Sequence, residues 1–122
     1  MLDSCGEVVY IVVMAETLGT FEQAVLLATL RLGKHAYGRA ILREMDRSLG
    51  RDVAAGAVYA TLDRLETKSY VASRLGEGTP ERGGRARRYF RVTASGVRAL
   101  NEAKAMLEAL WQTVSWPAGG QA

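Results

Sequence analysis

The sequence predicts a mainly α-helical fold with one small β-hairpin, in the order of three helices, a hairpin and a last helix. Three observations lead to this prediction. Apolar residues recur at helical spacing between residues 20 and 68, a glycine-bearing segment rich in arginine follows, and a second apolar repeat occupies residues 100–114. The 122 residues fit one main domain, expected at 19–92, with a terminal helix at 93–116 and a disordered tail at 117–122.

Residues 1–18 are expected to form an N-terminal extension, and the sequence leaves its structure open. Five β-branched residues between Val8 and Val13 favour a strand, but no partner strand is apparent nearby. A short helix or an arm that packs on another subunit fits equally well, and so does a natural start at Met14. The apolar run is too short to cross a bilayer and acidic residues precede it, so we expect neither a membrane anchor nor a secretion signal.

The first helix is expected to begin at Thr20, which can cap it together with Gln23 in the pattern of a capping box. Its apolar residues lie on nearly all faces, which is typical of a central, buried helix. Gly33 is expected to end it.

The second helix carries one apolar face that runs from Tyr37 to Leu49, and Gly50 is expected to end it. Its charged residues lie elsewhere around the helix. We therefore interpret Glu44 and Asp46 as part of a solvated face.

The third helix is expected between Ala55 and Lys68, with its apolar stripe on Val58, Leu62 and Leu65. The opposite face begins with small residues, which let a helix N-terminus approach another surface with its free N–H groups pointing outward. That face holds Gly56, Ala60, Asp63 and Thr67, flanked by Tyr59 and Arg64.

Residues 70–74 and 87–92 are expected to form two strands, because glycines and a proline gather between them as in a long turn. The net charge of +3 is unevenly distributed around this hairpin. The segment Arg82–Arg91 contains five arginines and no acid, so it carries +5 and the rest of the chain sums to −2. A local excess of positive charge indicates a polyanion partner, although a solvated arginine-rich loop has the same composition.

The last helix is expected to begin after Thr93 as its cap and to carry an apolar seam of 3-4-3-4 spacing. Such a seam favours pairing with a second copy of the chain. The expected dimer interface comprises Leu100, Ala103, Leu107, Leu110, Trp111 and Val114. Trp111 is also the candidate contact for a flat aromatic effector, although an aromatic residue on such a helix is more often dimer core.

This order of elements is that of a winged helix-turn-helix, in which the third helix enters the major groove of double-stranded DNA and the hairpin follows the phosphate backbone. Arginine suits phosphate because its fork of donors matches two oxygens. For Tyr37 and Tyr59 core packing is the alternative role, and Arg64 can instead pair with Asp63 or Glu66. The expected DNA-binding residues are His35, Tyr37, Ala55, Gly56, Tyr59, Ala60, Arg64, Arg82, Arg85, Arg87 and Arg88.

Three segments resemble signatures of PadR-type transcriptional regulators: TFEQ at 20–23 with HAYG at 35–38, GAVYATLDRLE at 56–66, and RYFRVTASG at 88–96. The resemblance spans about residues 20–110. With a single terminal helix, the chain resembles the branch of the family that has a short C-terminal helix. It implies a dimeric bacterial transcription factor, usually a repressor that an effector relieves. Two residues depart from the family pattern, since Ala60 stands where proline is usual and Ser69 where glycine is usual.

No nucleophile with a base, no phosphate loop and no metal-ligand spacing is visible, so we expect no enzyme, no metal and no cofactor. Cys5 is the only cysteine and His35 the only histidine. A lone thiol fits the reducing cytosol, and a cytoplasmic location is therefore expected.

The rival interpretation is a winged-helix module whose third helix docks on another protein without operator binding. Five arginines without an acid argue against it, because a protein-docking hairpin has little need of them. RNA binding is disfavoured, since no aromatic stacking platform on a sheet is evident.

Overall fold

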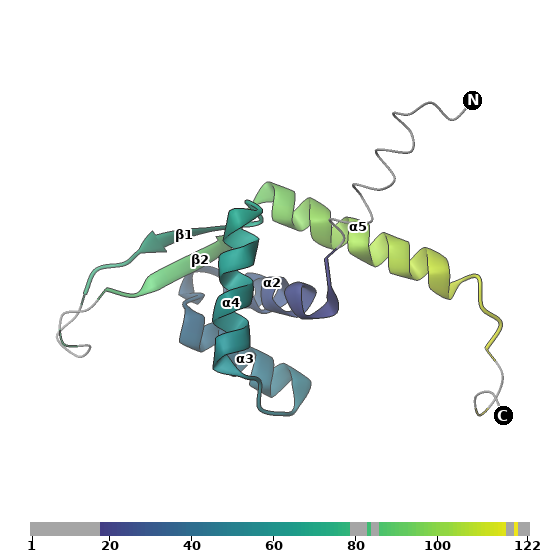
Figure 1. The fold of residues 1–122 in the computed structure, drawn as a ribbon, viewed down its shortest axis with the longest axis horizontal. Coiled ribbons are helices and arrows are strands. Elements are labelled where there is room, and N and C mark those ends of the chain that lie inside the picture. The colour runs from purple at the N-terminus through teal and green to yellow at the C-terminus, as the bar shows by residue number, and fades with distance from the viewer. Residues whose placement is uncertain (1–17, 79–82, 84–85, 117–118, 120–122) are drawn as a thin grey trace.

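The computed structural model describes residues 18–78, 83, 86–116 and 119. Its elements, drawn in Figure 1, confirm the predicted class of a mainly helical fold with one hairpin. They are α2 (Thr20–Leu32), the 3-10 turn η1 (Gly33–His35), α3 (Gly38–Leu49), α4 (Ala55–Thr67), β1 (Val71–Leu75), β2 (Arg88–Val92) and α5 (Ala94–Trp111). The expectations for residues 1–17 lie outside the described residues.

The N-terminal cap of α2 is Gly19 and not Thr20, so the predicted Thr20 cap is wrong. The carboxylate of Glu22 reaches back and accepts a hydrogen bond of 3.0 Å from the Gly19 N–H. It also pairs with the Lys68 ammonium at 3.0 Å. Burial raises the pKa of Glu22, but these two partners outweigh it and hold the pKa below its ordinary value of 4.5.

The C-terminal ends of the helices require left-handed backbone at three places. Gly33 and Gly50 end α2 and α3 as predicted, with φ of 60° and 66°. After α4 the corresponding position is Ser69, whose φ of 65° is the only positive value at a non-glycine among the described residues. A side chain in this region is strained, so the departure from the family's usual glycine leaves a strained turn before β1.

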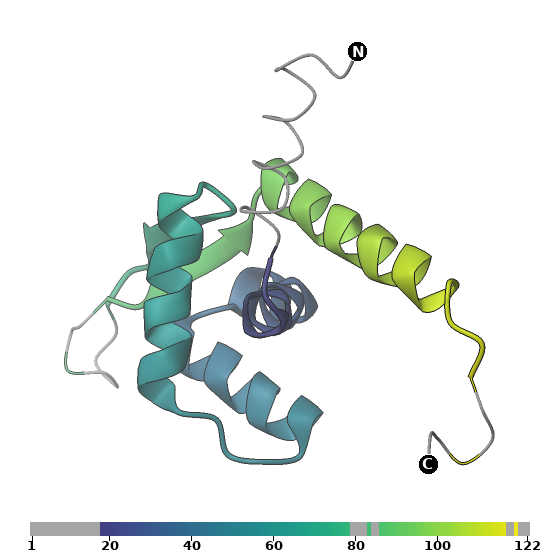
Figure 2. The same ribbon diagram turned by 45° about the vertical axis from the view of Figure 1, so that its right-hand side comes forward.

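Helix α2 lies at the centre of the fold, and Figure 2 shows it nearly along its axis with α3, α4 and α5 around it. Its buried residues Val25 and Leu26 meet Ile41 and Met45 of α3 and an apolar stripe of α4. That stripe is Val58, Leu62 and Leu65, as predicted. Leu27 and Leu30 on another side of α2 stay exposed, at 56% and 46%, so the expectation of a helix buried nearly all round is met only in part.

Glu44 of α3 is buried, with 4% of the residue exposed, so its predicted place on a solvated face is wrong. Arg47 and Ser48 donate hydrogen bonds to its carboxylate, and the Arg31 guanidinium of α2 lies 3.0 Å from it. The hydrogen bond from Arg47 is the main reason that the pKa of Glu44 lies below its ordinary value of 4.5. The burial is tolerated because the charge is fully partnered.

Strands β1 and β2 pair antiparallel, with Val71 opposite Val92 and Leu75 opposite Arg88. These two paired strands and the described residues next to their joined ends, 76–78 and 86–87, are called the wing below. The Phe90 N–H donates to the Ala36 carbonyl at 2.8 Å, so the wing also docks on the segment before α3. Its position relative to α3 and α4 is therefore set by backbone hydrogen bonds as well as by the buried Phe90 ring.

The cap of α5 is Thr93 as predicted, since its Oγ1 accepts from the Gly96 N–H at 3.1 Å. The helix ends at Trp111, so the expected helix up to residue 116 is too long and Val114 lies beyond it. Leu100 and Ala103 are buried in the core of the single chain. None of the described helices is long and apolar enough to cross a membrane.

Candidate nucleic-acid interface

Helix α4 has one face in the core and one face in solvent. Val58, Thr61, Leu62 and Leu65 are buried, whereas the exposed face comprises Ala55, Gly56, Ala57, Tyr59, Ala60, Asp63, Arg64 and Thr67. No side chain caps its first turn and that turn contains no acidic residue. The helix therefore presents its positive N-terminal end and only small side chains at that end, which suits the close approach of an anionic surface.

Tyr59 lies at the junction of α4 with α3. Its side chain is partly exposed, with 44% of the residue accessible. A Cβ placed on Gly38 would lie 2.3 Å from Cε1 of Tyr59 and 3.1 Å from its hydroxyl oxygen. The ring therefore rests directly on the backbone of α3, and its DNA-facing role stays a prediction.

A groove of about 450 Å³ lies between α4, the start of α3 and the wing. It contains four arginine side chains and a single carboxylate, that of Asp63, so its net charge is strongly positive. Such a charge beside an exposed helix favours phosphate. The lining residues include Tyr37, Gly38, Arg39, Arg43, Tyr59, Asp63, Arg87 and Arg88.

Tyr37 is the centre of a row of aromatic and guanidinium groups at the base of the wing. The Arg87 guanidinium carbon lies 4.0 Å from the centre of the Tyr37 ring, and Arg43 donates to the Tyr37 hydroxyl at 3.4 Å. On its other side Tyr37 meets Tyr89 edge to face at 5.8 Å between ring centres, and Arg74 lies 4.7 Å from the Tyr89 ring. Each of the two guanidinium groups is attracted to an aromatic ring, and its N–H donors stay available.

Arg88 points to α4 and not away from it. Its guanidinium forms an ion pair with Glu66 and donates to Ser73 Oγ at 3.0 Å, and Ser73 in turn donates to Glu66. This network holds the wing on α4. The arginine expected to clamp phosphate is thus largely neutralised by a carboxylate.

The remaining predicted residues take varied positions. His35 is exposed in η1, and Arg64 donates to Thr61 Oγ1 at 3.0 Å, not to Asp63 or Glu66. Arg82 and Arg85 lie outside the described residues. In the part of the chain that the structure describes, no three histidine, cysteine, aspartate or glutamate residues gather as a metal site.

Arg39 and Arg43 line the groove and Arg74 lies over the Tyr89 ring, but none of the three was among the predicted DNA-binding residues. A signal for two of them is present in the sequence. Arg39 and Arg43 are four residues apart, so they share one helix face directly after Tyr37. Nothing local indicates Arg74, because its place depends on the pairing of β1 with β2.

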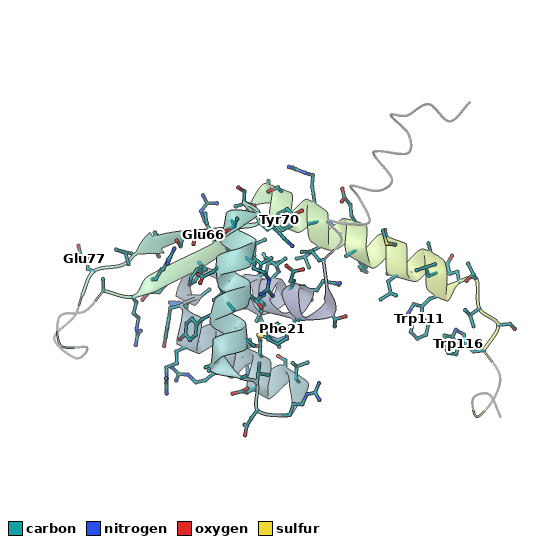
Figure 3. All side chains as sticks on the ribbon, viewed as in Figure 1. Phe21, Glu66, Tyr70, Glu77, Trp111 and Trp116 are labelled. Atoms are coloured by element: carbon teal, nitrogen blue, oxygen red, sulfur yellow. The ribbon has the colours of Figure 1, made fainter. Side chains whose placement is uncertain are left out.

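A second, apolar surface lies where α5 leaves the core. Leu107 and Trp111 are 55% and 56% exposed, and Leu110, Val114 and Trp116 are exposed as well. Figure 3 shows Trp111 and Trp116 together at the far end of α5, away from the body of the fold, and their ring centres are 4.8 Å apart. Of the expected seam, the part from Leu107 onward is therefore exposed in the described chain.

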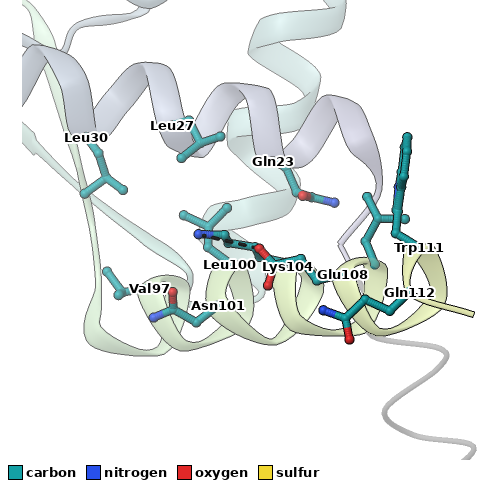
Figure 4. A pocket seen from close by; sticks show the side chains of 11 residues that line it. Gln23, Leu27, Leu30, Val97, Leu100, Asn101, Lys104, Glu108, Trp111 and Gln112 are labelled. Carbon is teal, nitrogen blue, oxygen red and sulfur yellow. Dashed lines mark ion pairs between the residues drawn. The ribbon is translucent and has the colours of Figure 1, made fainter.

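Between α2 and α5 this surface forms a groove of about 750 Å³, shown in Figure 4. Leu27 and Leu30 line one side, and Val97, Leu107 and Trp111 line the other. Polar groups are confined to a few side chains, among them the pair Lys104 and Glu108 with 3.8 Å between its charged atoms.

Comparison with known proteins gives a consistent result. A profile of the transcriptional regulator PadR-like family matches residues 26–102. A search of curated protein sequences finds no match. Among solved structures, the chain is similar to a PadR family transcriptional regulator from Eggerthella lenta DSM 2243, with 28% sequence identity, a TM-score of 0.63 and 88% of each chain covered.

Two further solved structures agree. A PadR-like transcription factor from Bacteroides fragilis shares 27% identity at a TM-score of 0.64, over 78% of this chain and 86% of that one. A PadR-like transcriptional regulator from Bacillus cereus strain ATCC 14579 shares 21% identity at a TM-score of 0.60, over 78% and 87% of the two chains. At the lower identity the likeness supports the fold alone.

Proposed function

The chain belongs to the transcriptional regulator PadR-like family, and on that premise we propose that it is a cytoplasmic, homodimeric repressor that binds a specific DNA site and releases it in response to a small molecule. The observation that carries this proposal is the exposed face of α4 beside a groove with four arginines and one carboxylate. Membership in a family of regulators supports DNA binding, while the features below support the finer assignments.

In the proposed complex the exposed face of α4 lies in the major groove. Gly56 and Ala60 allow the helix to approach the bases, and Arg64, Tyr59 and Asp63 offer the polar groups that distinguish them. Sequence-independent affinity comes from the cations around the groove. These are Arg39, Arg43 and Arg87, and Tyr37 adds its hydroxyl. His35, exposed just before α3, offers a ring N–H, and Arg82 and Arg85 are proposed as further phosphate contacts from their place in the sequence.

The second half of α5 is proposed as the dimer interface. Leu107, Leu110 and Trp111 expose apolar area on a helix that extends beyond the core, and a second copy would remove it from water. Isologous pairing would place two α4 helices on one face of the dimer, in register with two half-sites of a pseudo-palindrome.

The groove between α2 and α5 is proposed to hold the effector. Its volume of about 750 Å³ is that of a site for a small organic molecule. Trp111 offers a flat face for an aromatic ring, and Lys104, Gln23 and Asn101 offer polar contacts. A ligand at the proposed interface would change how the two copies meet, and with it the spacing of the two α4 helices.

The proposal is tested by titrating the protein into duplex DNA from its own upstream region, at low salt and with an excess of unrelated duplex. We expect a retarded complex that the unrelated duplex does not remove. Absence of a complex, with a folded dimer verified by sedimentation, would contradict the proposal and favour the rival role as a protein-docking module.

A further inference from the structure

The wing carries a second groove on the face that points away from α4. Side chains of successive strand residues alternate between the two faces of a sheet. Arg88 and Ser73 bond to Glu66 of α4 and so mark the inner face, which leaves Arg74 and Tyr89 on the outer one. The outer groove has a volume of about 420 Å³ and is lined by Gly33, Lys34, Ala72, Ser73, Arg74, Tyr89, Phe90 and Arg91.

The charge of this outer wing groove is one-sided. Lys34, Arg74 and Arg91 contribute three cations, and no lining residue is acidic. All three side chains are exposed, and among the described residues none of the three forms an ion pair. Three like charges around one hollow repel one another, so an anion in the hollow gains from all three.

One of the three cations is held in place before any ligand arrives. The Arg74 guanidinium lies 4.7 Å from the Tyr89 ring centre, and Tyr89 is itself fixed by Tyr37 on one side. On another side the Tyr89 ring lies on the backbone of Gly76, where a Cβ would be 2.7 Å from Cε1. A stacked guanidinium keeps its edge donors free and loses less entropy when they bind an oxyanion.

We propose that the outer wing groove, formed by Lys34, Arg74 and Arg91, is a second phosphate-binding site, separate from the groove beside α4. The phosphate has two chemical sources. One is the DNA backbone that flanks the site read by α4, an assignment that rests on the proposed function. The other is a free phosphate group, which does not depend on it.

The DNA source is tested with two duplexes, one limited to the DNA site that the protein binds and one extended by a helical turn at each end. For each, the affinity of the dimer is measured against salt concentration. Each phosphate contact contributes about 0.9 to the log–log slope. We expect a steeper slope on the long duplex, and loss of this difference in the double variant Lys34→Ala, Arg91→Ala.

Arg98→Ala is the matched control, since Arg98 is an exposed cation of α5 that lines none of these grooves. It should leave the difference between the two duplexes unchanged. Thermal unfolding of all variants verifies that the wing is folded.

Binding of a free phosphate group is tested by NMR titration of the protein with inorganic phosphate and pyrophosphate. We expect shifts at the backbone amides of Lys34, Ala72 and Arg91 that the double variant loses and Arg98→Ala keeps. A difference in slope that the double variant loses would support the site and identify DNA as the source of the phosphate. The shifts that the double variant loses would support it and identify free phosphate.

Equal slopes on both duplexes together with no phosphate-induced shift would overturn the proposal. Should the wild-type protein bind no duplex at all, the proposed function fails while the phosphate titration still decides on this site.

Discussion

The ring of Tyr59 in α4 lies on Gly38 in the first turn of α3, close enough that a Cβ at Gly38 would be 2.3 Å from Cε1 of the ring. Two motifs separated by about twenty residues in the sequence thus form one contact. The contact orients the tyrosine at the edge of the exposed face of α4, where it lines the groove with the arginines.

Gly38→Ala should therefore weaken DNA binding more than it destabilises the fold. The new methyl group displaces the Tyr59 ring, and because that ring is 44% exposed it can swing into solvent at roughly the lower end of the 1–3 kcal/mol that overpacking costs. Two quantities are measured for the variant and the wild type: the affinity for duplex DNA from the upstream region and the free energy of unfolding. A loss of stability of several kcal/mol, or unchanged affinity, would show that the contact does not orient Tyr59 for DNA.

Gly56→Ala places a methyl group directly on the exposed face of α4, where it touches no other part of the protein. Nothing lies within 4 Å of the position that its Cβ would take. The free energy of unfolding of the variant should be equal to that of the wild type or higher by up to about 1 kcal/mol, because alanine has a higher helix propensity than glycine. Its DNA affinity should nevertheless fall, since the methyl group separates α4 from the bases.

Ser69→Gly should stabilise the protein. The left-handed φ of 65° costs an L residue roughly 1–2 kcal/mol, and glycine removes that cost while losing part of the gain to a more flexible unfolded chain. We expect a net gain of up to about 1 kcal/mol in chemical denaturation. Ser69→Ala retains the Cβ, so it should match the wild type, and a gain in both variants would refute strain as the cause.

Glu44→Gln should make the folding stability of the protein less dependent on pH in the acidic range. The pKa of Glu44 in the folded protein lies below 4.5. The charged carboxylate therefore stabilises the fold at a pH above the pKa of Glu44 in the unfolded chain, and this stabilisation is lost as the pH falls through the folded-state pKa. The groups that face it are Arg47 and Ser48 of α3 and Arg31 of α2. The variant should be less stable at about pH 7 and approach the wild type at about pH 3.

Glu102→Gln is the control for that experiment, because Glu102 is exposed on α5. It should follow the wild-type curve at every pH. A Glu44→Gln curve parallel to the wild type would mean that the ion pairs of Glu44 contribute nothing to folding.

Arg87→Ala should reduce the salt dependence of DNA binding by about 0.9 in the log–log slope if Arg87 contacts one phosphate. Arg88→Ala tests the opposite case, since Arg88 is already paired with Glu66. It should change the slope little and lower the stability of the wing on α4. Equal changes in slope for the two variants would contradict the division of roles between them.

Leu107→Arg should convert the dimer into a monomer or an aggregate, because it places a charge in the middle of the proposed interface. Sedimentation velocity measures the outcome. Ala105→Arg adds the same charge on another, exposed part of α5 and should leave the dimer intact. A normal dimer in Leu107→Arg would place the interface elsewhere.

The order of elements and most helix ends could be predicted because they depend on local signals. Glycines with left-handed φ end α2 and α3, and Thr93 caps α5. The start of α2 was misjudged, since Thr20 has the right chemistry but the carboxylate of Glu22 satisfies the Gly19 N–H instead.

The parts of the site that could not be predicted depend on contacts between distant segments. Arg88 is one of five arginines in its segment, and only the packing of the wing on α4 brings it to Glu66. Leu100 resembles Leu107 in the seam, yet the core covers the first and leaves the second exposed. Periodicity identifies a helix face but not how far along the helix a neighbouring element covers it.

The central claim is that the exposed face of α4, held twice in a dimer, reads a specific DNA sequence. Selection of bound duplexes from a random pool tests it most directly. A dimer that reads DNA with its two α4 helices should enrich one pseudo-palindromic site whose half-sites are centred about one helical turn apart, roughly 34–36 Å. Recovery of no common sequence by folded, dimeric protein would contradict it.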